Sequence, residues 1–252
     1  DIGAPVSQSG KVKLQYPMPS MNKKKDEKSI KQWFDKHPMI HENAFNYVIS
    51  AKLDGVSAMF CNENGEYKLY TRGDGVSGQD ISHMIPYLSQ LDRIKSKKIT
   101  VRGELLITKE LFEKKYTKKF RNRRNFVSGV VNQTKDLDSK ESVKKYKDID
   151  FICYEIIAPV MTLQDQFGLI NAINGDTPLN IITFEKIPTI KELSEYLQNW
   201  RDVYQYEIDG IIVAYNSKMQ NKKVRENKNP EDAFAFKMAL TDQTAETFVT
   251  DV

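Results

Sequence analysis

Cysteine is scarce in this sequence, and long apolar runs are missing. Only two cysteines occur among the 252 residues, Cys61 and Cys153, and they lie far apart within apolar stretches. Neither has the close spacing of a zinc site or of a thiol redox motif, so we expect buried free thiols. No run of about 18 apolar residues is present, and the N-terminus lacks the basic and apolar parts of a signal peptide. These absences argue against a membrane protein and favour a soluble protein of the cytoplasm.

The overall charge is small, but its distribution is uneven. The formal net charge is +4, which says little about binding to nucleic acid. Between Glu113 and Arg124, however, seven residues are basic and one is acidic. Such a segment could neutralise several phosphates of DNA, or it could be a solvated helix and loop, and charge alone leaves both readings open. The residues expected to contact DNA are Lys118, Lys119, Arg121 and Arg123.

The first part of the chain predicts an extended segment, one helix and several strands. Residues 1–25 are rich in proline, serine and lysine and have little periodicity, which predicts an extended lead-in strapped across the domain. A short helix is expected from Glu27 to Lys36, ending before Pro38. Three β-rich runs follow, and we expect them to form an antiparallel meander. They cover residues 46–52, 57–62 and 66–72.

The remaining elements complete an α+β pattern. The clearest helix runs from Ile190 to about Tyr204, because Thr189 and Glu192 can form a capping box and apolar residues repeat at helical spacing. Residues 109–116 and 126–133 look helical or irregular. Further strands are predicted at 98–107, 148–157, 209–216 and 232–238. No repeat or interdomain linker is evident, so we expect a single domain over residues 1–252, with mainly antiparallel sheets and flanking helices.

Five short fragments carry the chemical information. Lys52-Leu53-Asp54-Gly55 stands where one predicted strand ends and another begins. Alone it is a weak signal, because a lysine at a strand end is usually a solvated charge. Four more fragments follow in order, namely TRGDG (71–75), RGELLI (102–107), EIDGIIV (207–213) and AFAFKM (233–238). Together they resemble motifs I, III, IV and V of the covalent nucleotidyltransferase superfamily of ligases and capping enzymes.

Other stretches narrow the resemblance to one family. IGAPV at residues 2–6 and YPMPSMN at residues 16–22 look like the lead-in of NAD-dependent DNA ligases. TRGDGVSGQDIS is similar to that family's TRGDG-x-x-GED-I-T, and Arg123-Arg124-Asn125 with Gly129 is similar to its N-P-R-N-A-A-A-G. The resemblance covers residues 2 to 252. It implies the ATP-grasp-like adenylation fold of ligases.

The resemblance also implies substrates, partners and surroundings. NAD would donate AMP, Mg²⁺ would assist, and nicked double-stranded DNA would receive the AMP. The family's N-terminal region that holds nicotinamide mononucleotide, and its OB-fold domain, are expected to lie outside this chain, on further ligase domains or a second subunit. A bacterial cell or a virus-infected host is the expected setting.

The chemistry explains the residue types in the fragments. The amine of Lys52 can attack an α-phosphate and form a phosphoramide, provided that it first loses its proton. Nearby cations favour that loss by like-charge repulsion. Asp54 and Glu104 suit a hard ion such as Mg²⁺, which is held by one or two carboxylates plus substrate phosphate. The resemblance assigns Glu104 to the ribose and the metal environment.

The expected site follows from these roles. Catalytic residues are Lys52, Asp54, Glu104, Lys237, Arg72 and Asp209. Nucleotide-binding residues are Lys52, Gly55, Arg72, Glu104, Arg124, Arg201 and Lys237, because cations stabilise the charge that grows on the phosphoryl oxygens. Gly55, Gly73 and Gly103 are expected where the backbone approaches the nucleotide or turns tightly.

Three positions depart from the family pattern. Ser50 stands where an adenine-reading glutamate is usual, Ala214 replaces a lysine of motif IV, and Asn132 replaces an arginine after the basic segment. Lys218, Lys222 or Lys223 could substitute for the lysine lost at position 214. Ser50 and Ala214 support one alternative, a degenerate nucleotidyltransferase that only binds DNA or a partner. A second alternative is an ATP-dependent DNA or RNA ligase, although the lead-in and the TRGDG-x-x-G segment argue against it.

Overall fold

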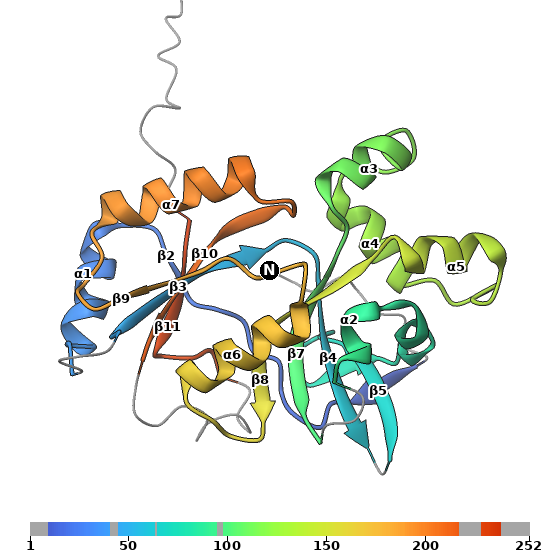
Figure 1. Ribbon diagram of the computed structural model, residues 1–252, viewed down its shortest axis with the longest axis horizontal. Helices are drawn as coiled ribbons and strands as arrows, with labels where there is room; N and C mark the ends of the chain where they lie inside the picture. Colours follow the sequence, from blue (N-terminus) through green and yellow to red (C-terminus); the bar gives the residue numbers. More distant parts are fainter. Residues whose placement is uncertain (1–9, 41–44, 64, 95–97, 217–227, 238–252) are drawn as a thin grey trace, which may run out of the picture.

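The computed structural model describes residues 10–40, 45–63, 65–94, 98–216 and 228–237 (Figure 1). Its strands are β1 (Lys11–Lys13), β2 (Lys23–Lys24), β3 (Tyr47–Leu53), β4 (Val56–Glu63), β5 (Glu66–Thr71), β6 (Ser77–Gln79), β7 (Thr100–Leu106), β8 (Asp150–Ala158), β9 (Ile181–Phe184), β10 (Ile208–Tyr215) and β11 (Ala233–Phe236). Its helices are α1 (Glu27–Lys36), η1 (Ser82–Tyr87), α2 (Ser89–Asp92), α3 (Lys109–Lys115), α4 (Arg123–Val131), α5 (Lys140–Lys147), α6 (Leu163–Asn174) and α7 (Ile190–Val203).

Two sheets form the body of the fold. A five-stranded sheet has the order β2-β11-β10-β3-β9, and a four-stranded sheet has the order β5-β4-β7-β8. All strand pairs are antiparallel except β2 with β11. Figure 1 shows α1 and α7 on the side of the five-stranded sheet and α3, α4 and α5 on the side of the four-stranded sheet. The expected α+β class, with mainly antiparallel sheets and flanking helices, is confirmed.

One face of the five-stranded sheet is buried under helices. The Trp33 ring of α1 lies edge-on against Phe234 with centroids 4.8 Å apart, and Phe34 packs on Tyr47 at 5.2 Å. Tyr196 of α7 covers Phe184 on the same side. Because side chains alternate along a strand, Lys52 of β3 belongs to the opposite face. We refer to this Lys52-bearing face as the ligand face.

The expected meander of three strands is wrong in one respect. β4 and β5 form the predicted hairpin, but β3 pairs with β10 and β9 in the other sheet. Alternation of apolar residues identifies a strand without identifying its partner. The chain passes from one sheet to the other at Asp54-Gly55. There the backbone N–H of Asp54 donates a hydrogen bond to the carbonyl oxygen of Glu207 at 3.0 Å.

The described part of the lead-in runs along both sheets. β1 pairs with β6, and β2 adds to the edge of β11. Between these anchors Leu14 and Met18 are buried against Met59, Tyr70 and Ile157 on the outer face of the four-stranded sheet. Residues 1–9 of the predicted lead-in lie outside the described residues.

Several local predictions are confirmed. The helix at 27–36 begins at the N-cap Asp26, and the helix from Ile190 has the capping box of Thr189 and Glu192. Both cysteines are buried, as expected, and neither forms a disulfide. Within the described residues, no helix is long and apolar enough to cross a membrane.

Gly103 has a structural role that the sequence did not indicate. A Cβ atom at this position would lie 2.4 Å from Cζ of Phe151 and 2.7 Å from the carbonyl oxygen of Ile152. Packing between β7 and β8 therefore requires a glycine at this position. This packing explains Gly103 without a nucleotide close to its backbone.

We predict opposite stability changes at two glycines. Gly103→Ala should lower the free energy of unfolding by about 2 kcal/mol or more, because the new methyl group meets backbone and a buried ring. Gly168→Ala in α6 should raise it by about 0.5 to 1 kcal/mol, because nothing lies within 4 Å and alanine favours a helix. Urea denaturation of both variants measures the difference. Equal midpoints would contradict the packing described for Gly103.

Candidate active site

The passage between the two sheets brings the first motif next to the third. Gly55 follows Asp54 in the turn, and a Cβ there would lie 2.1 Å from the carbonyl oxygen of Leu105. Only glycine allows this approach. Its backbone N–H donates to Oε1 of Glu104 at 3.1 Å. The end of β3 and the middle of β7 therefore meet at Gly55.

Lys52 and Lys237 converge on one carboxylate. Nζ of Lys52 lies 2.9 Å from Oδ1 of Asp209, and Nζ of Lys237 lies 2.5 Å from Oδ2. Asp209 is an extra residue in β10, because Leu53 pairs with Ile208 while Lys52 pairs with Gly210. A β-bulge of this kind redirects a side chain. Here it presents Asp209 between the two ammonium groups.

The electrostatics of this cluster favour the ionised carboxylate. Burial alone would raise the pKa of Asp209, but the charge of Lys52 and the hydrogen bond from Lys237 outweigh it and hold the pKa below its usual value. Two positive groups thus flank one negative group in a partly exposed position. The excess positive charge suits the binding of a phosphate.

Glu104 is the most perturbed acid of the site. Its side chain is buried, and Oε2 accepts a hydrogen bond from Oγ of Ser57 at 2.8 Å. Burial raises the pKa of Glu104 to about 7, although the hydrogen bond from Ser57 and the charge of Lys52 oppose this. A cation close to Glu104 would restore its ionised form.

Tyr154 is a neighbour that the sequence did not reveal. It is an extra residue in β8, because Gly103 pairs with Cys153 while Arg102 pairs with Glu155. Burial and the charge of Glu104 raise the pKa of its hydroxyl, and Ser57 bonds to it. A tyrosine in a mainly apolar strand is a usable sign of a site, because its hydroxyl needs a partner.

Arg124 joins the site through Asp54. Arg124 stands in the first turn of α4, whose N-cap is Asn122, and its Nη1 lies 2.8 Å from Oδ1 of Asp54. Arg124 also lines a hollow between α4 and the end of β5. This hollow is bordered by Gly55, Val56, Ser57, Thr71, Arg72, Gly73, Arg124, Ser128, Val131 and Asn132. Four of the expected site residues and Asn132 therefore share one hollow.

Arg201 is not drawn into this cluster. It lies in the last turn of α7, and its carbonyl oxygen accepts a hydrogen bond from Nζ of Lys109 at 2.6 Å. Among the described residues, no hydrogen bond or ion pair joins its guanidinium to the other expected site residues. Its role in nucleotide binding stays a prediction.

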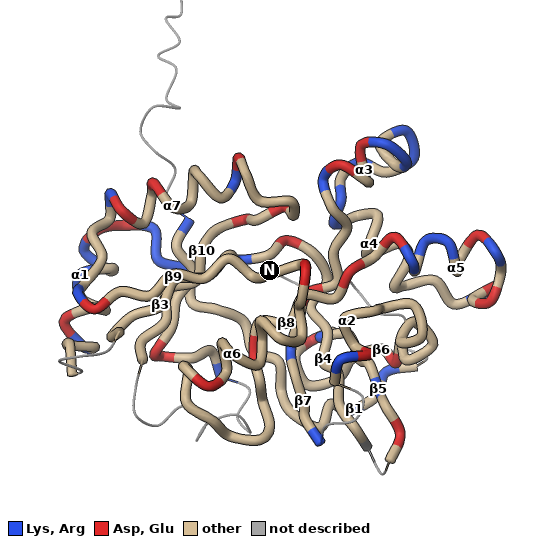
Figure 2. The backbone as a smooth tube through the Cα atoms, in the orientation of Figure 1, with Lys and Arg blue, Asp and Glu red and all other residues tan. Residues whose placement is uncertain are grey.

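The basic segment divides into exposed and paired residues. Figure 2 shows lysine and arginine gathered on α3. Lys118, Lys119 and Arg121 are exposed. Arg123 instead bonds to Glu207 and Glu113, each at 2.8 Å, so its charge is already balanced. The first three fit contact with DNA better than Arg123 does.

Two of the three departing positions lie on the ligand face of the five-stranded sheet, and the third, Asn132, caps the end of α4 at the hollow. Ser50 is on the same face as Lys52, and Ala214 pairs with Val48 on that face. Lys218, Lys222 and Lys223, which could replace the lysine missing at 214, lie outside the described residues.

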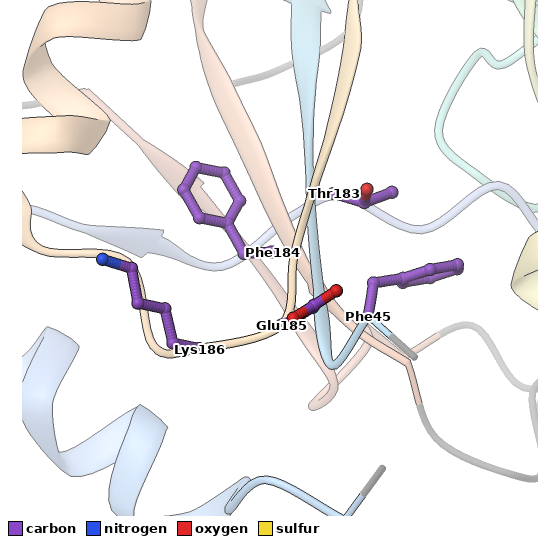
Figure 3. A pocket seen from close by; sticks show the side chains of 5 residues that line it. All are labelled: Phe45, Thr183, Phe184, Glu185 and Lys186. Carbon is purple, nitrogen blue, oxygen red and sulfur yellow. The ribbon is translucent and has the colours of Figure 1, made fainter. Parts of the chain in front are cut away.

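A second hollow lies at the free edge of the same sheet, beside β9 (Figure 3). Phe45, Thr183, Phe184, Glu185 and Lys186 line it. None of the expected site residues belongs to it, so the candidate site stays at the junction of the two sheets.

The chain is similar to known proteins in sequence and in fold. Residues 6–240 match the family model of the NAD-dependent DNA ligase adenylation domain. A DNA ligase of Acanthamoeba polyphaga mimivirus is 38% identical over 247 residues, which cover 94% of this chain and 35% of that protein. A DNA ligase of Malacoplasma penetrans is 30% identical over 258 residues, which cover 96% and 36%.

The chain spans about a third of the length of these curated relatives. Among solved structures, Pmar-Lig_PreS3 has a TM-score of 0.54 and 12% identity, over 89% of this chain and 47% of that one. This likeness concerns the fold alone. The matched family model, together with the ordered motifs, shows that the chain belongs to the family of NAD-dependent DNA ligase adenylation domains.

Proposed function

We propose that the chain is the AMP-accepting module of an NAD-dependent DNA ligase. In this function Nζ of Lys52 attacks the α-phosphorus of NAD. The bond from that phosphorus to the bridging oxygen breaks, nicotinamide mononucleotide leaves with the electron pair, and the amine proton goes to solvent. The AMP then passes to the 5′-phosphate of a nick in double-stranded DNA. The convergence of Lys52 and Lys237 on Asp209 is the observation that carries this proposal.

The cluster supports distinct roles for its members. Asp209 orients the Lys52 amine, because its Oδ1 lies 2.9 Å from Nζ. Lys237 is held next to the nucleophile by the same carboxylate, so it can meet the oxygens of the α-phosphate. Arg124 and Arg72 add positive charge on the side of the hollow. Positioning and charge supply most of the rate in phosphoryl transfer.

The carboxylates support a role for Mg²⁺. Glu104 and Asp54 offer the hard oxygen atoms that this ion prefers, and it is commonly held by one or two carboxylates with substrate phosphate and water completing the shell. Among the described residues, no group of three or more His, Cys, Asp or Glu side chains could hold a metal ion by itself. When bound, Mg²⁺ would neutralise charge on the phosphates. Glu104 would then be kept ionised despite its burial.

Two departures support the alternative of a module that binds without catalysis. Ser50 and Ala214 leave the ligand face of the sheet without a charged group at those positions. The retained set of Lys52, Asp209 and Lys237 argues for catalysis, because two lysines brought to one carboxylate have no evident use in packing.

The acceptor residue can be identified by mass. After incubation with NAD and Mg²⁺, we expect one AMP on the peptide that contains Lys52, and Lys52→Ala should carry none. Lys237→Ala should keep the same acceptor but react at least about tenfold more slowly, since it removes a cation from the transition state. Lys191→Ala, an exposed lysine of α7, serves as the control and should behave like the original protein. Adduct from ATP but not NAD would favour the ATP-dependent alternative. Absence of any adduct, also when the region that holds nicotinamide mononucleotide is supplied, would favour the binding module.

Glu104→Gln should separate stability from activity. The pKa of Glu104 is raised from 4.5 to about 7 in the folded state. Its protonation therefore stabilises the fold fully below pH 4.5, and this contribution is lost as the pH rises through 7. Glutamine never ionises. The variant should gain stability relative to the original protein by roughly 2 to 3 kcal/mol between pH 4.5 and pH 8.5, while adenylation slows at least about tenfold.

Denaturant titrations at both pH values, with the rate of adduct formation at neutral pH, measure these two effects. A stability difference that does not change with pH would contradict the burial of the Glu104 carboxyl. Unchanged adenylation would remove Glu104 from the site.

Contact with DNA should depend on salt through the exposed basic residues. Replacing Lys118, Lys119 and Arg121 by alanine should weaken binding to a nicked duplex and reduce the slope of log Kd against log salt by about 0.9 per lost phosphate contact. Arg123→Ala should instead lower the melting temperature, because it leaves Glu113 and Glu207 without their partner. Fluorescence anisotropy over a salt series measures the slopes, with Lys191→Ala as the control. An unchanged slope in the triple variant would place the DNA elsewhere.

A further inference from the structure

Arg72 is tied to a residue far away in the sequence. Its Nη2 donates a hydrogen bond to Oγ of Ser20 at 2.8 Å, across 52 positions of the chain. The Arg72 backbone is fixed as well, because its N–H donates to the carbonyl oxygen of Ser57 and its carbonyl accepts from Gly75. Its buried Nε has no hydrogen-bond partner among the described residues. The guanidinium is therefore held on one side by Ser20, and no hydrogen bond among the described residues accounts for its buried Nε.

The lead-in fixes the place of Ser20. On one side, the N–H of Met18 donates to the carbonyl oxygen of Gly75 at 2.8 Å, and Arg102 donates to the carbonyl oxygen of Pro17. On the other side, the N–H of Ala235 donates to the carbonyl oxygen of Asn22 at 2.8 Å. Pro17 and Pro19 restrict the backbone just before Ser20. The hydroxyl is thus presented from a braced segment.

We propose that Ser20 is a positioning residue for Arg72, so that the lead-in contributes directly to the active site. An arginine side chain has many rotamers, and fixing it costs conformational entropy. The hydrogen bond to Ser20 selects one orientation before substrate arrives. In that orientation Arg72 borders the hollow that it shares with Arg124 and Asn132. This inference rests on the proposed function, in which the hollow receives a phosphate of the substrate.

The first test examines the Arg72–Ser20 contact without relying on catalysis. Phenylglyoxal modifies free guanidinium groups, and the modified peptide is identified by mass. Ser20→Ala should raise the modification rate of Arg72 about threefold or more, because one net hydrogen bond of ordinary strength is lost. Ser20→Thr keeps a hydroxyl and should restore the original rate. Asn22→Ala is the matched control, because Asn22 is in the same lead-in and does not contact Arg72.

The second test uses coupling between the two residues in adenylation by NAD. Ser20→Ala should slow adduct formation about three- to tenfold, Ser20→Thr should recover it, and Asn22→Ala should leave it near the original rate. In an Arg72→Ala background, adding Ser20→Ala should have no further effect, because the partner is gone. Melting temperatures of all variants identify any general loss of folding.

Two results would overturn the proposal. One is an equal effect of Ser20→Ala with and without Arg72. The other is an equal slowing by Ser20→Ala and Asn22→Ala with equal loss of melting temperature, since this would mean that Ser20 only holds the lead-in. If the original chain forms no adduct, the proposed function fails, and the phenylglyoxal rates still decide whether Ser20 orients Arg72.

Discussion

The close approach of Gly55 to the carbonyl oxygen of Leu105 is the constraint on which the site depends. There is no room for a side chain at position 55. Because this residue is a glycine, the chain can turn there from β3 directly onto β4 of the second sheet. The turn leaves Lys52 at the end of one sheet and brings the N–H of Gly55 onto Glu104 in the other. A larger residue at position 55 would push the two sheets apart, and Lys52 would then move away from Glu104. The first and third motifs are thus one structural unit, although 49 positions separate Gly55 from Glu104.

Two β-bulges bring further side chains to the candidate site. Asp209 is the extra residue of the bulge in β10, and Tyr154 is one of two extra residues in β8. Both lie beside the candidate site. In a regular strand without the extra residue, the register would shift by one position. Each of these side chains would then point to the other face of its sheet. The bulges allow Asp209 to reach both lysines and Tyr154 to reach Glu104 and Ser57. The geometry of the site therefore depends on local irregularities in otherwise regular sheets.

These irregularities mark the limit of prediction from the sequence. Local patterns were sufficient for the helix at 27–36, the capped helix at 190–203 and the strands that carry the motifs. They were not sufficient for the partner of β3, because register and pairing are set by contacts far apart in the chain. The four-residue strand β9 and the helix α6 gave no clear periodicity. The link between Ser20 and Arg72 joins two segments that no local pattern connects.

The distribution of charge explains why the departures at Ser50 and Ala214 are compatible with an intact cluster. The ligand face of the five-stranded sheet carries small or apolar groups at these positions, and the lysines stand at its end, where β3 and β11 finish. Further positive charge stands at the hollow, through Arg124 on α4 and Arg72 after β5. Cations from several elements can together stabilise negative charge on a phosphate. Alanine at position 214 therefore takes one cation away from the face of the sheet. Lys237, which shares the Asp209 carboxylate with Lys52, stays in place.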